Sequence, residues 1–63
     1  MPEDLHKVKK YVEHYIEHID EHADKLKELS KEVTSKDLLK YFEDAIRDIE
    51  KATSSLKELL NKL

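Results

Sequence analysis

Three histidines lie at intervals of four residues in the first half of the sequence, and this spacing would suit the binding of a metal ion. His14, His18 and His22 fall on successive turns if this segment is helical. Imidazoles one turn apart can bind the same ion through ring nitrogens at about 2.0–2.1 Å. Because a helix rises about 12 Å from His14 to His22, we expect two rings per ion, with His18 and His22 as the leading pair.

Two imidazoles make a weak site, so other groups must complete it. Glu17 and Glu21 lie in the same stretch, and Asp48 lies in the second half of the chain. If two-fold symmetry brings His18 and His22 of two chains together, four imidazoles would surround one ion and clamp a homodimer. Imidazole and carboxylate ligands suit zinc, nickel, cobalt or copper. We therefore predict a site for one of these metals at His14, Glu17, His18, Glu21 and His22.

The histidine segment does not match the known catalytic metal motifs. The run from His18 to His22 has the spacing of the H-E-x-x-H zinc motif but lacks a glutamate directly after the first histidine. Di-iron bundles use paired Glu-x-x-His elements, and no glutamate precedes His14, His18 or His22 by three residues. An enzyme is therefore not expected, and storage, sensing or delivery of a metal is the predicted role.

A seven-residue apolar repeat predicts the helix that carries the histidines, from about residue 3 to about residue 32. Pro2 and the acids after it suit a first helical turn. The repeat predicts a buried seam with Ile16 and Ala23 on one flank and Tyr11 on the other. The seam residues are Leu5, Val12, Ile19, Leu26 and Val33 in one row and Val8, Tyr15, His22 and Leu29 in the other.

A second helix is predicted from about residue 36 to about residue 62, after a turn at about 33–35. Thr34 or Ser35 can cap it, with Asp37 placed for a capping box with Thr34. The tyrosines and Phe42 are expected to pack in the core or at its boundary. The predicted seam residues are Leu38, Phe42, Ala45, Ile49, Ala52, Leu56, Leu59 and Leu63, with Leu39, Ile46, Thr53 and Leu60 beside them.

A short connection makes two helices antiparallel neighbours, so the fold class is all-α, an antiparallel helical hairpin forming one domain over residues 1–63. An isolated hairpin of this kind would leave four apolar side chains exposed to solvent, those of Ile16, Leu39, Ile46 and Leu60. A chain of 63 residues without cysteine also lacks disulfides to stabilise a small core. We therefore expect a homodimer in which two hairpins form a four-helix bundle.

An alternative interpretation gives the histidines no function. His22 would then be a core histidine bonded to a tyrosine hydroxyl or to Asp48, His18 a boundary residue and His14 an exposed one. The protein would be a structural or protein-interaction module, captured by its partner through an exposed flank of the bundle.

The composition excludes several classes of partner. Charged residues make up 43% of the chain, with 15 acidic against 12 basic and a net charge of −3, which disfavours binding to nucleic acid. There is no basic block for an anionic membrane, no apolar run near the ~20 residues of a membrane span and no signal peptide, so a cytoplasmic protein is expected. The Lys and Glu surplus is typical of thermophilic or designed proteins, and the connection without glycine favours a natural one.

The same residues resemble a small, functionally uncharacterised helical-hairpin family of bacteria and archaea. In that family the first helix reads roughly E-H-W-I-E-H-N-x-E-H-A, which residues 13–23 follow, and Ala45 and Ala52 echo the spaced alanines of its second helix. Tyr15 stands in place of the tryptophan and Ile19 in place of the asparagine. The resemblance implies the hairpin fold and favours His14, His18 and His22 as functional residues, and it implies no activity.

Overall fold

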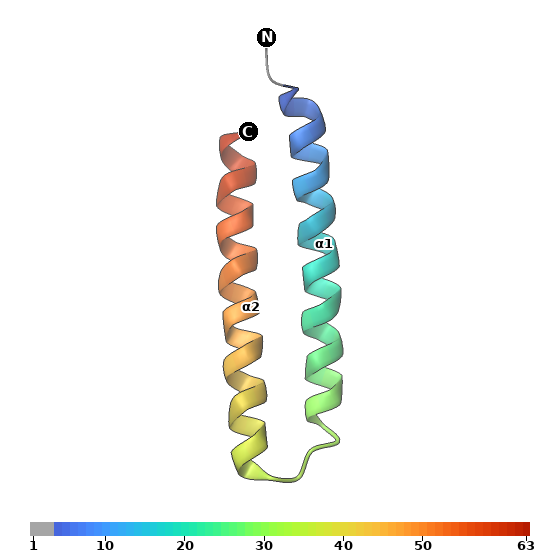
Figure 1. The fold of residues 1–63 in the computed structure, drawn as a ribbon, viewed down its shortest axis with the longest axis vertical. Coiled ribbons are helices and arrows are strands. Elements are labelled where there is room, and N and C mark those ends of the chain that lie inside the picture. The colour runs from blue at the N-terminus through green and yellow to red at the C-terminus, as the bar shows by residue number, and fades with distance from the viewer. Residues whose placement is uncertain (1–3) are drawn as a thin grey trace.

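The computed structural model describes residues 4–63 and consists of two long helices. Helix α1 spans Leu5–Ser30 and helix α2 spans Lys36–Lys62. They run antiparallel and side by side, so that the start of α1 and the end of α2 lie at the same end (Figure 1). No strand occurs within residues 4–63. The predicted all-α helical hairpin is confirmed.

Side chains cap the N-termini of both helices. The Lys7 backbone N–H donates to the Asp4 carboxylate at 3.0 Å, and the Leu38 N–H donates to the Ser35 hydroxyl at 3.4 Å. Residue 3, the predicted start of the first helix, lies outside the described residues, and α1 ends at Ser30, two residues before the predicted end. The cap of α2 is Ser35, so the predicted capping box of Thr34 with Asp37 is wrong, and Asp37 instead lies in the first turn, near the positive end of the helix dipole.

Replacing Ser35 with alanine tests this cap. The Leu38 N–H would lose its acceptor, so we expect the S35A variant to lose about 1 kcal/mol of unfolding free energy. Urea unfolding followed by circular dichroism measures the loss. T34A is the matched control, and an equal loss in T34A would contradict the assignment of Ser35 as the cap.

The contact between the helices is narrow. Three described residues are buried, namely Ile16, Ala23 and Thr53, which retain 8%, 5% and 6% exposure. Half-buried apolar side chains extend the seam in both directions. These are Val12, Ile19 and Leu26 on α1, and Leu39, Phe42, Ile46, Ile49, Leu56 and Leu60 on α2.

One of the two predicted seam rows is wrong on each helix. Four side chains that the sequence predicts to be exposed in a lone hairpin instead lie in the seam, namely Ile16, Leu39, Ile46 and Leu60. Tyr11, Tyr15 and Tyr41, expected in the core or at its boundary, are more than half exposed. The predicted seam residues that the structure leaves exposed are Leu5, Val8, Tyr15, His22, Leu29, Leu38, Ala45, Ala52 and Leu59.

The change of seam has a physical cause. Burying Tyr15 and His22 would remove a phenol hydroxyl and two ring nitrogens from water, which is costly without hydrogen-bond partners. Ile16 and Ala23, the residues that follow them, carry no such groups. On α2 the observed seam buries Leu39 and Ile46 in place of Leu38 and Ala45, which hides more apolar area.

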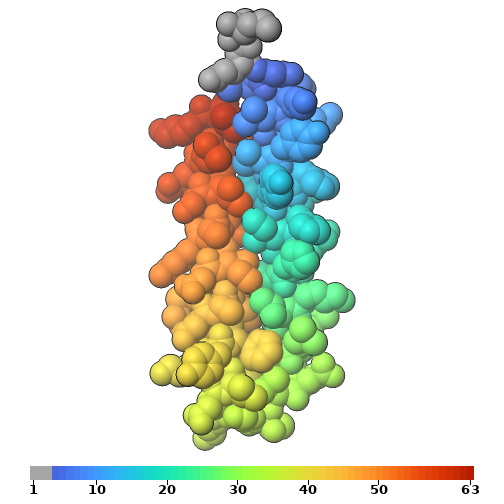
Figure 2. Space-filling model, viewed as in Figure 1, coloured from blue at the N-terminus to red at the C-terminus, as the bar shows by residue number. Residues whose placement is uncertain are grey.

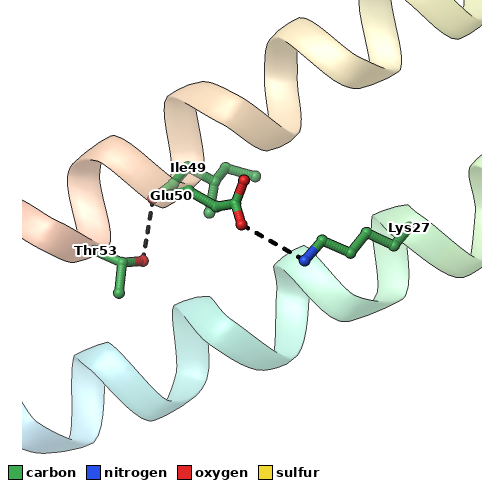
Figure 3. Close-up of polar contacts among 4 residues, drawn as sticks. All are labelled: Lys27, Ile49, Glu50 and Thr53. Carbon is green, nitrogen blue, oxygen red and sulfur yellow. Dashed lines mark hydrogen bonds and ion pairs between the residues drawn. The ribbon is translucent and has the colours of Figure 1, made fainter.

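Thr53 is the one polar side chain in the buried set. Its hydroxyl donates to the Ile49 carbonyl one turn earlier at 3.1 Å, so the group is satisfied within α2 (Figure 3). Nearby, the Lys27 ammonium of α1 lies 3.6 Å from the Glu50 carboxylate of α2. This ion pair joins the two helices across one edge of the seam. Side chains of α1 and α2 meet along the length of the hairpin in the space-filling view (Figure 2).

Candidate metal-binding site

The structure brings two of the predicted ligands together. The Nε2 atoms of His18 and His22 lie 3.1 Å apart, and their ring centroids lie 4.5 Å apart with the planes nearly perpendicular. For the two rings to hydrogen-bond at this distance, one must donate its N–H and the other must accept it. The two nitrogens that could bind a metal therefore lie next to each other on the exposed surface of α1.

The separation of the two nitrogens suits a chelated ion. With metal–nitrogen bonds of about 2.0–2.1 Å, nitrogens 3.1 Å apart subtend roughly 95–100° at the ion. This lies between the angles of about 90° and about 109° found in octahedral and tetrahedral coordination. An ion bound between the two rings would replace the shared proton, and the donor ring would then carry its remaining proton on Nδ1. Since both rings project from the middle of α1, the helix itself positions them.

The other predicted ligands lie apart from this pair. The His14 ring stacks nearly parallel to the His18 ring at a centroid distance of 6.5 Å, against 4.5 Å between the rings of His18 and His22. His14 and Glu17 line one shallow hollow of the surface, while Glu21 and His22 line another. Within residues 4–63 no group of three histidine, aspartate or glutamate side chains is arranged to hold a metal.

The surroundings of His22 differ from both sequence interpretations. It was placed in the seam, where a tyrosine hydroxyl or Asp48 would satisfy its ring, but it is exposed and its partner is His18. His18 is exposed as well. An ion held by the two rings would therefore keep open positions for water or for ligands from another molecule. The i, i+4 spacing was enough to find the pair, whereas the direction in which His22 points depends on the seam.

Comparison with known proteins identifies a family and no closer relative. Residues 8–63 match the family model described as a domain of unknown function, DUF8180. Neither a curated protein nor a solved structure matches the chain. Within residues 4–63, neither helix is both long and apolar enough to cross a lipid bilayer. The family match takes in α2, all but the first three residues of α1 and both histidines of the pair, and the chain belongs to the DUF8180 family.

Proposed function

We propose that this protein binds a divalent transition metal through His18 and His22. The supporting observation is the 3.1 Å separation of their Nε2 atoms, which matches the bite of a chelating histidine pair. Imidazole nitrogen suits zinc, nickel, cobalt and copper. Water completes the coordination, because the described part of the chain offers no third ligand.

This kind of site fits reversible binding. Two protein ligands on an exposed helix surface hold an ion less firmly than the three or four of catalytic and structural zinc sites. The ion can also leave without unfolding the hairpin, because neither ring lies in the seam. Storage, sensing or delivery of a metal are roles that such exchange permits.

Calorimetric titration with zinc chloride tests the proposal. We expect wild-type protein to bind one zinc ion per chain, and the H18A and H22A variants to bind it at least about tenfold more weakly, because each loses half of the ligands. H14A and H6A are matched controls: each removes one exposed imidazole from α1 outside the pair. Both should keep the wild-type affinity.

Two results would contradict the proposal. One is a wild-type titration with no more heat than the H18A/H22A double variant shows. The other is an equal loss of affinity in all four single variants, which would mean that zinc binds diffusely to surface carboxylates and imidazoles. Repeating the titration with nickel chloride shows whether a negative result belongs to zinc alone.

A further inference from the structure

The two long edges of the hairpin differ sharply in character. Six residues that directly follow seam residues are charged and exposed, and we call them the charged rim: Glu13, Asp20, Lys27, Glu43, Glu50 and Lys57. A second set of exposed and mostly apolar residues lies one position before Ile16, Ala23, Leu39, Ile46, Thr53 and Leu60, and the same heptad row continues at Val8 and Leu29. We call them the apolar rim: Val8, Tyr15, His22 and Leu29 of α1, and Leu38, Ala45, Ala52 and Leu59 of α2.

Both halves of the apolar rim lie on the same face of the hairpin. On antiparallel helices, a given rotation away from the shared seam leads to the same side of the pair. The ion pair of Lys27 with Glu50 places the charged rim on the opposite face. The hairpin thus has one face suited to water and one that exposes side chains such as Tyr15, Leu38 and Leu59 at 61%, 54% and 46%.

The hairpin exposes more surface than a compact protein of the same mass. The chain exposes 5585 Å², whereas a compact protein of 7.5 kDa is expected to expose about 4,250 Å². The excess, about 1,300 Å², exceeds the roughly 800 Å² that each partner buries in a standard protein interface. A standard interface on the apolar rim would cover about 800 Å², which is more than half of this excess.

We propose that a second copy of this chain covers the apolar rim, forming a four-helix bundle in which α1 of each copy packs on α2 of the other. The two-fold axis then runs along the bundle, and the connections of both hairpins lie at the same end. This differs from the bundle expected from the sequence, which used Ile16, Leu39, Ile46 and Leu60 as the interface. The structure places those residues in the hairpin's own seam.

Side-chain size favours the pairing of α1 with α2. The α1 half of the rim carries the large residues Tyr15, His22 and Leu29, and the middle of the α2 half carries Ala45 and Ala52. Facing α1 with α2 of the second copy sets large side chains against small ones, which lets the layers interdigitate. Facing α1 with α1 would instead crowd tyrosine and histidine rings together.

Charge at the border of the rim favours the same pairing. Lys25 lies one turn from both His22 and Leu29, and Asp48 lies one turn from both Ala45 and Ala52. Lys27 and Glu50 lie at the same level of the hairpin. Because the helices are antiparallel, the level of Lys25 on α1 is then about four residues, or ~6 Å along the axis, from the level of Asp48 on α2. A lysine of one copy can therefore reach Asp48 of the other.

The proposed dimer does not depend on the metal. With α1 facing α2, the two histidine pairs lie on diagonally opposite helices, so each ion is held by one chain, and no four-imidazole clamp forms. The dimer should therefore form in the presence of a chelator. Failure of metal binding and failure of dimerisation are separate results.

Sedimentation equilibrium in EDTA is the first test. We expect wild-type protein to sediment at twice the 7.5 kDa of one chain, and L59E to shift towards monomer at the same concentration. N61E adds the same charge two residues away, directly after the seam residue Leu60, and should remain a dimer. The proposal would be overturned if wild-type protein is helical but remains a monomer over a 100-fold range of concentration. It would also be overturned if N61E loses the dimer while L59E keeps it. The first of these results does not depend on whether L59E stays folded.

A mixing experiment tests the pairing of helices. K25E and D48K each place like charges at both copies of the border contact, whereas their heterodimer holds one natural and one reversed ion pair. Native mass spectrometry of an equimolar mixture at low ionic strength should therefore show heterodimer above the statistical half. A statistical mixture would show that α1 does not face α2 of the second copy.

Discussion

Zinc at about 100 times its dissociation constant should raise the melting temperature of the wild-type protein by roughly 10–20 °C. At that concentration, a ligand that binds only the folded state adds about 2.7 kcal/mol of unfolding free energy. In a domain of this size, each kcal/mol shifts the melting temperature by about 4–8 °C. The effect is large because the two nitrogens of His18 and His22 converge only when α1 is helical. Thermal unfolding followed by the circular dichroism signal of the helices measures this rise in melting temperature.

The histidine variants separate a specific shift from a general salt effect. H18A and H22A should keep at most about half of the shift between EDTA and zinc, because a tenfold weaker site adds only about 1.4 kcal/mol at the same zinc concentration. H14A should keep the full shift, since its ring lies 6.5 Å from that of His18 and does not join the pair. Protein concentration must be the same in every scan, because self-association also moves the melting temperature. A shift that is unchanged in the H18A/H22A double variant would rule out the pair as the site.

Ile16→Ala should be the most damaging single truncation in the hairpin, with a loss of about 2–4 kcal/mol of unfolding free energy. Ile16 is the most buried large side chain among the described residues, at 8% exposure. Its removal leaves a cavity between two helices that have little other core to compensate. Because a domain of this size has only about 3–5 kcal/mol from a single core, the I16A variant should be largely unfolded near 37 °C. Urea unfolding at fixed protein concentration gives the value.

Leu5→Ala is the matched comparison for this truncation. The sequence repeat places Leu5 in the seam and Ile16 on its flank, but the structure leaves Leu5 44% exposed at the first residue of α1. We therefore expect L5A to lose less than about 1 kcal/mol, since only part of the side chain leaves water. A larger loss in L5A than in I16A would contradict the placement of Ile16 in the seam and of Leu5 at its exposed end.

Local rules were sufficient to predict the elements and the histidine pair. Apolar residues at helical spacing predicted both helices, and Ser35 was among the two caps expected for the second helix. The four-residue interval between His18 and His22 was enough to place their rings one turn apart, because helix geometry alone sets that distance. These features depend on residues close in the sequence.

The tertiary contact decided which side of each helix is buried. The repeat contains two apolar rows, one through Tyr15 and His22 and one through Ile16 and Ala23, and a helical pattern by itself accommodates either. Packing selects the row whose burial leaves no polar group without a partner, so Ile16 is covered and His22 stays on the surface. The exposure of His22 on the hairpin, where its ring meets that of His18, follows from that choice, which depends on the opposing helix and not on the neighbours of His22 in the chain.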